Sequence, residues 1–137
     1  MKHPMYVTAD DAVKAVRTGD HIHLSSVASV PHILIESLCR RADAGEVRDL
    51  HFHHFHTEGP APYAEPKYEG IFFDQGFFIG PNVRADANAG YADYLPVHLS
   101  ESQKLYRSGA LRCDVAMVQV SLPDENGMFS LGTSVDC

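Results

Sequence analysis

The first half of the chain alternates between helical and strand-like patterns of apolar residues. Residues 8–19 carry a capping threonine, two acidic residues and then apolar positions at helical spacing, which predicts a helix closed by Gly19. Residues 21–24 and 49–55 alternate as short strands do. Between them, residues 31–44 predict a second helix that begins at proline. Its expected inward positions are Ile33, Leu34, Leu38 and Ala42. This order of elements predicts an α/β domain with a mainly parallel sheet flanked by helices.

The second half continues with shorter and less regular elements. Residues 59–70 form a loop rich in proline, glycine and tyrosine, with no apolar period. After it we expect an aromatic strand over 71–79 interrupted at 74–76, a helix over 82–90 that ends at glycine, a peripheral strand over 94–99 and a helix over 100–107.

The stretch 114–136, DVAMVQVSLPDENGMFSLGTSVD, is centred on an apolar run at 115–120. Only Gln119 interrupts it, which predicts a strand covered on both faces in the middle of a parallel sheet. Pro123 and Gly127 then break the pattern, and 128–131 predicts a second short strand. The alternative interpretation is a β-hairpin at a sheet edge. Because ligands bind at the carboxyl ends of parallel strands, we expect a site at the loop after Val120 and at the turn 130–134.

Length and charge limit the classes of function. A chain of 137 residues is one domain's worth, and a net charge of −7 argues against nucleic-acid and anionic-membrane partners. No apolar run is long enough to span a membrane, and the N-terminus lacks a signal peptide's apolar core, so a cytoplasmic location is expected. Cys39, Cys113 and Cys137 are odd in number and are interpreted as unpaired thiols in a reducing compartment.

A histidine cluster at 51–56, HFHHFH, is the most conspicuous chemical feature. On a strand, His54 and His56 would share one face with Phe52, whereas His51 and His53 would share the other. Two histidines with Glu58 nearby would suit a metal, but the spacing matches no zinc signature. Histidines that are structural or that line a cleft are the favoured interpretation. His21 and His23 are conjectured partners on a neighbouring strand.

The segment 56–63, HTEGPAPY, is the better candidate for a site because it leaves the end of a strand. His56, Thr57 and Glu58 offer polar groups, and Gly59 allows close backbone approach. The alternative is a loop that is merely rigid. Serines 25 and 26 lack the G-x-S-x-G context of a nucleophile, and no phosphate-binding glycine motif is present.

Three ordered motifs give the chain a family resemblance. Residues 118–136 read VQVSLPDENGMFSLGTSVD, upstream lie HTEGPAPY and FFIG followed by NVR, and then ADYLP and LSE. Together they closely resemble the N-terminal domain of the acetyl-CoA hydrolase/4-hydroxybutyrate CoA-transferase family, over about residues 8–136. One departure is Leu122, where the family usually has the first of two prolines.

The resemblance implies a NagB/RpiA-like CoA-transferase domain at 1–137 that is incomplete. Coenzyme A would be a substrate, with no cofactor, and the partners would be an acyl-CoA (acetyl, butyryl or 4-hydroxybutyryl) and a small carboxylate such as acetate. A glutamyl-CoA thioester would form on a glutamate in a second domain beyond Cys137, because Glu58, Glu101 and Glu125 do not match it. A homo-oligomer, or pairing with that second domain, is expected.

By position in the family, six residues of this chain would line the substrate cleft. They are Ser26, His54, His56, Thr57, Glu58 and Gly59. The resemblance does not imply that the chain acts alone. Two alternatives stay open: a non-catalytic or metal-binding α/β module that uses the histidine cluster, and an interaction domain that completes a site with a separately encoded second half.

Overall fold

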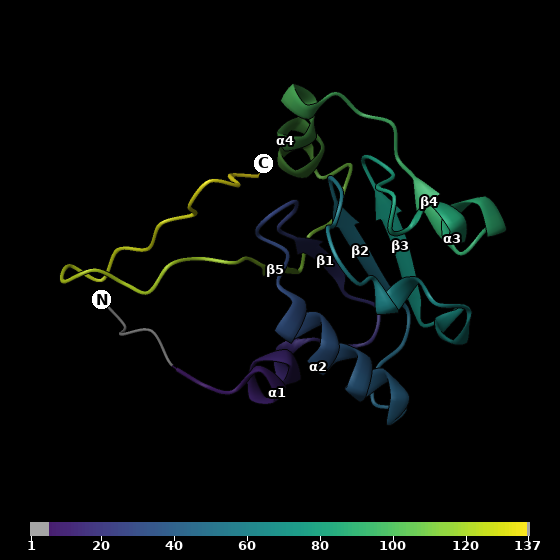
Figure 1. Ribbon diagram of the computed structural model, residues 1–137, viewed down its shortest axis with the longest axis horizontal. Coiled ribbons are helices and arrows are strands. Elements are labelled where there is room, and N and C mark those ends of the chain that lie inside the picture. The colour runs from purple at the N-terminus through teal and green to yellow at the C-terminus, as the bar shows by residue number, and fades with distance from the viewer. Residues whose placement is uncertain (1–5, 137) are drawn as a thin grey trace.

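The computed structural model describes residues 6–136, and within them a five-stranded sheet is parallel at every strand pair (Figure 1). The strands lie in the order β4-β3-β2-β1-β5. Their bounds are β1 His21–Leu24, β2 Leu50–His54, β3 Phe72–Gly76, β4 Ala92–Tyr94 and β5 Val115–Met117. The helices are α1 Ala9–Ala12, α2 His32–Asp43, α3 Arg84–Ala89 and α4 Leu99–Ser108. The predicted α/β class with a parallel sheet and flanking helices is confirmed.

One face of the sheet, here called the apolar face, packs beneath α2. Alternate residues of each strand supply it, as strand geometry requires. Its buried members on the three central strands are Ile22, Leu24, Leu50, Phe52 and Phe72. Helix α2 contributes Ile35, Leu38, Cys39 and Ala42, which recur at helical spacing. Each fully buried large side chain stabilises the fold by roughly 1.5–3 kcal/mol relative to an exposed one, so this layer forms the core.

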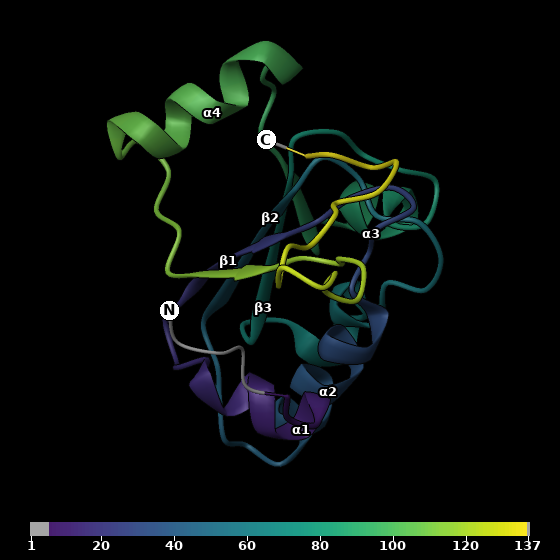
Figure 2. The same ribbon diagram turned by 90° about the vertical axis from the view of Figure 1, so that its left-hand side faces the viewer.

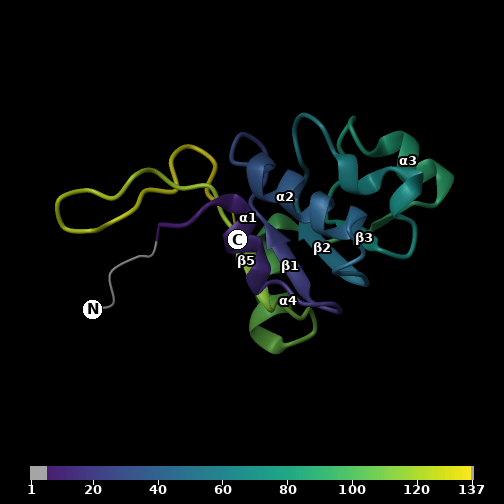
Figure 3. The same cartoon turned by 90° about the horizontal axis from the view of Figure 1, so that it is seen from below.

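The opposite face carries histidines at the alternating positions and is here called the imidazole face: His21, His23, His51 and His53. Parallel pairing sets His21 beside His51 and His23 beside His53. The His21 Nδ1 and His53 Nε2 atoms are 3.0 Å apart, and the His21 and His51 rings stack at 4.4 Å. The conjectured partnership across neighbouring strands is therefore confirmed. Helix α4 lies on this side, across the sheet from α2 (Figures 2 and 3).

The N-terminal helix is shorter than predicted. Thr8 caps it as expected, because its hydroxyl accepts a backbone hydrogen bond at 3.1 Å. Helix α1 tightens into a 3-10 turn at Val13–Ala15, and Val16 is extended, so the prediction of a helix up to Gly19 is wrong. The guanidinium of Arg41 donates to carbonyl oxygens of this turn and of Val16. It thereby satisfies acceptors that a longer helix would have bonded internally.

Helix α2 agrees with its predicted span to within one residue at each end, with Pro31 as the N-cap. The inward face differs at one position. Ile33 is 71% exposed, whereas Ile35 is 1% exposed. Ile35 lies three residues before Leu38, which is the spacing of neighbours on one helix face. The prediction that Ile33 points inward is therefore wrong.

Strand β3 runs without a break through the predicted interruption at 74–76. Asp74 stays in the strand because its carboxylate is buried against His54 of β2, with Oδ1 2.6 Å from Nε2. Strand β4 begins earlier than the predicted 94–99 strand and ends before Pro96, which cannot donate to a ladder. It is the edge strand, as the prediction of a peripheral strand required.

The two later helices end as predicted, at Gly90 and Gly109, which both have left-handed φ angles of 89° and 75°. Glycine closes a helix in this way because it has no Cβ to clash. Ser100 was expected to cap helix α4, but the cap is His98, so the helix begins two residues earlier, at Leu99.

Strand β5 pairs in parallel with β1, but it lies at the edge of the described sheet rather than in its middle. It ends at Met117, where the Gln119 N–H donates to the Ser25 hydroxyl, 3.1 Å away, instead of continuing the ladder. Val118 and Val120 are 37% and 40% exposed. The prediction of a central strand covered on both faces up to residue 120 is therefore wrong.

Residues 118–133, here called the arm, extend away from the body of the domain (Figures 1 and 3). The arm doubles back through a backbone hydrogen bond from Ser121 to Ser130 at 2.9 Å. The arm therefore reverses direction as the predicted hairpin would, but residues 128–131 do not form the predicted strand. Leu122 and Met128 are 85% and 67% exposed.

Cys39 is buried and Cys113 is exposed, and both are free thiols. Cys137 lies outside the described residues. Over residues 6–136, no helix has the length and apolar character needed to cross a bilayer.

Candidate functional site

A cavity of about 410 Å³ opens at the carboxyl ends of β1, β2 and β3. Its volume lies within the roughly 300–1,000 Å³ usual for small-molecule sites. The polar side chains on its wall are Ser26, His56, Ser134 and Asp136, and the apolar ones are Val27, Phe55, Phe77, Phe78, Val97, Leu99 and Val135. The wall thus combines a hydrocarbon lining with a few polar groups, which suits a short organic chain with a polar end.

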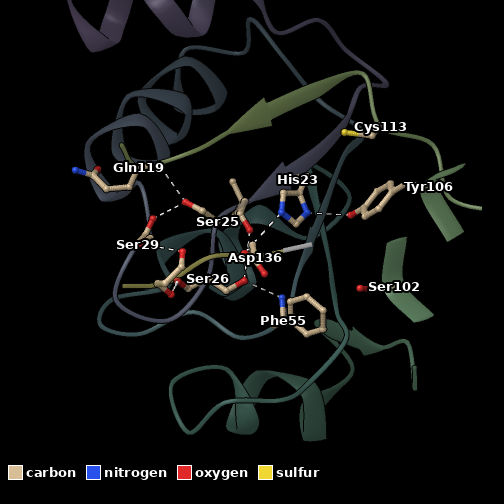
Figure 4. A network of polar contacts seen from close by, with 12 residues as sticks. His23, Ser25, Ser26, Ser29, Phe55, Ser102, Tyr106, Cys113, Gln119 and Asp136 are labelled. Carbon is tan, nitrogen blue, oxygen red and sulfur yellow. Dashed lines mark hydrogen bonds and ion pairs between the residues drawn. The ribbon is translucent and has the colours of Figure 1, made fainter. Parts of the chain in front are cut away.

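The serine-rich turn after β1 accepts hydrogen bonds from the chain just beyond β2 and beyond β5 (Figure 4). The Ser26 hydroxyl accepts from the Phe55 N–H at 2.9 Å, and the Ser25 hydroxyl donates to the Ser29 carbonyl. Ser25 and Ser26 are 1% and 2% exposed. Both hydroxyls are occupied by backbone partners, which favours a structural role over a nucleophilic one.

The segment 134–136 folds back across this turn. The Ser134 hydroxyl donates to the Ser26 carbonyl at 2.9 Å, and Asp136 Oδ2 lies 3.7 Å from His23 Nε2. Burial opposes ionisation of Asp136, but its polar contacts with His23 and Ser26 outweigh burial and hold its pKa below the usual value. The other nitrogen of His23 lies 3.0 Å from the Tyr106 hydroxyl of α4. The expected site region at 130–134 therefore reaches the cavity through Ser134, whereas ligand binding there stays a prediction.

Val27 holds a strained backbone conformation on the cavity wall. Its φ of 56° lies in the left-handed region, where a β-branched residue is an outlier. The conformation aims its N–H at the His56 carbonyl, 2.9 Å away, and forms a parallel bridge with Thr57. Such strain costs on the order of 1–3 kcal/mol and persists only where the surroundings enforce it. Nothing in the sequence pattern indicated it.

The predicted loop after β2 presents His56 to the cavity. His56 Nε2 lies 3.3 Å from a Glu58 carboxylate oxygen, and its ring meets Phe78 edge-on at 5.6 Å. The two side chains are 27% and 58% exposed, so both are open to a ligand. Of the six predicted cleft residues, the structure places Ser26 and His56 on the wall. Glu58 stands beside them, paired with His56.

Thr57 and Gly59 belong to the frame of this loop rather than to the cavity wall. Thr57 is 1% exposed, and its hydroxyl lies 2.8 Å from the Tyr63 hydroxyl. Gly59 has a φ of 77°, a conformation that glycine adopts without strain. Both accept hydrogen bonds from Asn82, which the sequence analysis placed in the NVR motif but not among the site residues.

His54 is fully buried on the apolar face, 2.6 Å from Asp74, and it does not reach the cavity wall. It shares this face with Phe52, because both rings meet Tyr63 edge-on. The predicted face-sharing of these two residues is confirmed. The sequence interpretation missed Asp74, because a polar residue in an aromatic run suggested a break.

Over residues 6–136, no group of three or more histidine, cysteine or acidic side chains is arranged to hold a metal ion. The histidines of the 51–56 cluster are divided between the two faces of the sheet and the cavity.

A parallel α/β sheet with a mostly apolar cavity at its carboxyl end defines an α/β domain of the kind that binds small ligands. The chain belongs to the acetyl-CoA hydrolase/transferase N-terminal domain family, whose sequence model matches residues 3–137. The resemblance drawn from its motifs is thereby confirmed, and the chain is homologous to CoA-transferases.

Relatives of known activity match almost all of this chain. It is 35% identical over 127 residues to the succinyl-CoA:acetate/propanoyl-CoA:succinate CoA transferase of Fasciola hepatica, covering 93% of this chain and 26% of that protein. It is 30% identical over 130 residues to the 4-hydroxybutyrate coenzyme A transferase of Clostridium kluyveri, covering 95% and 30%. The chain thus spans less than a third of the length of these relatives.

Solved structures share the fold. RipA from Yersinia pestis matches with a TM-score of 0.82 and 25% identity, over 92% of this chain and 31% of that one. The 4-hydroxybutyrate CoA-transferase of Porphyromonas gingivalis matches with a TM-score of 0.69 and 24% identity, over 92% and 27%, which bears on the fold alone.

Proposed function

We propose that this chain forms the acyl-binding side of a CoA-transferase site, where CoA moves between an acyl-CoA and a small carboxylate. The cavity at the carboxyl ends of the three central strands is the observation that carries the proposal. Its hydrocarbon lining suits a short acyl chain, and His56 on its wall would orient a thioester or carboxylate end. The names of the relatives, which transfer CoA to and from short carboxylic acids, support this choice of ligand.

In the covalent step, a glutamate carboxylate would attack the acyl-CoA carbonyl, expel the CoA thiolate and form an acyl–glutamyl anhydride. The thiolate would then attack the glutamyl carbonyl, which gives the glutamyl-CoA thioester and releases the carboxylate. We assign that glutamate to a part of the working enzyme other than this chain. Glu58 is paired with His56, Glu101 lies on α4, and Glu125 lies in the arm. His56 and Glu58 would orient the reacting group, while Phe77 and Phe78 exclude water.

The first test is turnover by the chain alone. We expect no exchange of CoA between acetyl-CoA and butyrate, because the residues of this chain do not include the nucleophile that we assign. Purified chain would be compared with a boiled sample by following acyl exchange. Activity above that control, in proportion to the amount of chain, would contradict the assignment of the nucleophile.

The second test uses an active enzyme in which this chain is joined to a family member's remaining part. His56→Ala and Glu58→Ala should each lower kcat by about 10²–10⁴-fold, the range of lost acid–base and orienting groups. The glutamyl-CoA species should still be trapped and seen by mass spectrometry, since its nucleophile lies elsewhere. Glu69→Ala, in an exposed loop away from the cavity, is the matched control. Unchanged rate and substrate preference in both variants would reduce the loop to scaffold.

A further inference from the structure

Asn82 lies in the turn between β3 and α3 and reaches across to the loop after β2. Its side-chain Nδ2 donates to the Thr57 hydroxyl and to the Gly59 carbonyl, each at 3.0 Å. The orientation of the amide follows from chemistry, because a carbonyl oxygen only accepts hydrogen bonds and must face the NH₂ group. Both N–H bonds of one amide are therefore used on a single loop, 23 and 25 residues away in sequence.

Local structure does not account for this placement. Asparagine before a helix commonly caps it, yet the N-cap of α3 is Val83, and no side chain bonds to the first turn. The Asn82 amide instead turns toward the loop and leaves its own Oδ1 buried without a partner. A Cβ on Gly80 would come within 2.8 Å of that oxygen, so the absence of a side chain there permits the placement.

The loop is also fixed from its other side. The Thr57 hydroxyl contacts the Tyr63 hydroxyl, which is 1% exposed, and the His56 carbonyl accepts from the Val27 N–H. Together with the bonds from Asn82, these hydrogen bonds fix the loop at residues 56, 57 and 59. The side chains of His56 and Glu58 take no part in them and pair with each other instead.

We propose that Asn82 is a positioning residue of the acyl-binding site: its amide clamps Thr57 and Gly59 and so holds the His56–Glu58 pair at the cavity. This inference rests on the proposed function for its purpose, whereas the clamp itself is tested independently. A fixed loop lowers the cost of orienting a reacting group, because the freedom is removed before the ligand arrives.

Asn82→Asp tests the clamp, because it keeps the shape of the side chain but removes both N–H donors. It also places a carboxylate oxygen against the Gly59 carbonyl oxygen, which repels it. We expect amide hydrogen exchange at Val27 to rise roughly tenfold, which corresponds to a loosening of the loop by about 1.4 kcal/mol. Exchange within α2 should not change. Asn88→Asp, an exposed substitution in α3 with the same change in charge, is the control and should alter neither.

A second readout separates positioning from general stability. In the parent chain, Glu58→Gln should shift the NMR signals of the His56 ring, since the two groups lie 3.3 Å apart. In the Asn82→Asp background that response should shrink, because the pair is no longer held. Should Asn82→Asp fail to fold, Thr57→Val and its hydroxyl-retaining counterpart Thr57→Ser carry the same comparison, with only Thr57→Val expected to weaken the response.

The outcomes distinguish the clamp from the proposed function. Unchanged exchange at Val27 together with an undiminished His56 response would overturn the clamp. If both change as expected but Asn82→Asp in the active enzyme leaves kcat and KM at parental values, the clamp stands and the role of the loop in acyl binding fails. A lower kcat at unchanged KM would support positioning of the reacting group rather than of the bound ligand.

Discussion

Phe52 and His53 are neighbours in β2, and both are fully buried, yet they face opposite sides of the sheet. Phe52 enters the apolar face, where it contacts the rings of Phe72 and Tyr63. His53 enters the imidazole face, where one nitrogen meets His21 and the other has no partner. Equal burial therefore has different consequences, since hydrocarbon gains from leaving water, whereas an imidazole loses hydration that one contact only partly replaces.

The comparison also explains why the two faces behave differently toward protons. Burial, followed by the neighbouring His21, lowers the pKa of His53 to about 4. Burial and the nearby His51 lower the pKa of His21 as well. His21 and His53 are therefore neutral at pH 7, and their close contact depends on staying neutral.

The largest expected effect is on the apolar face. Phe52→Ala removes a ring from the packed core, and we expect a loss of roughly 3–5 kcal/mol in the free energy of unfolding. Urea denaturation followed by circular dichroism would measure it. A loss below about 1 kcal/mol would mean that α2 does not depend on this face.

The next largest effect is a loss of folding stability at acidic pH. Because the pKa of His53 is lower in the folded chain than in the unfolded chain, the unfolded state binds more protons between pH 6.5 and about 4. The contribution of His53 to stability is therefore fully present above pH 6.5, and we expect it to fall by about 3 kcal/mol as the pH drops through this window.

His53→Gln provides the comparison for acid sensitivity, since glutamine retains a polar group but does not titrate. We expect a lower stability at pH 7 and a flatter slope between pH 6.5 and 4 than in the parent chain. Parallel slopes in urea denaturation across this range would show that other groups cause the acid sensitivity.

The smallest effect is expected at the partly exposed edge of the imidazole face. His51 stacks between His21 at 4.4 Å and Phe73 at 4.8 Å. His51→Ala should cost about 0.5–1.5 kcal/mol, the usual value of such ring contacts. Paired with Phe52→Ala, it compares adjacent positions of one strand. Equal losses at both positions would remove the distinction between the faces.

Alternation within strands and the order of elements could be predicted from the sequence, because both follow from local periodicity. The separation of Phe52 and His54 from His51 and His53 is an example. Errors arose where distant contacts decide the outcome. Asp74 stays in β3 because it pairs with His54 of another strand, and β5 ends at Met117 because the Gln119 N–H bonds to the Ser25 hydroxyl.

In the candidate site too, residues marked by local pattern could be predicted, whereas those placed by distant contacts could not. Position at a strand end indicated His56 and Glu58, and the structure brings them together at the cavity. His54 was expected there too, but its partner Asp74 holds it in the core. Asn82 and Asp136 contribute through contacts with residues more than 20 positions away, which no local pattern records.

A molecule that binds the exposed side chains of the arm would raise the stability of the folded chain. Its hydrogen bond from Ser121 to Ser130 gives it a defined shape while Leu122 and Met128 stay in water. A surface that covers these side chains in that shape recognises the folded chain, because the unfolded chain does not hold them in this arrangement. By mass action, the unfolding midpoint then rises with the logarithm of the free concentration of the covering molecule.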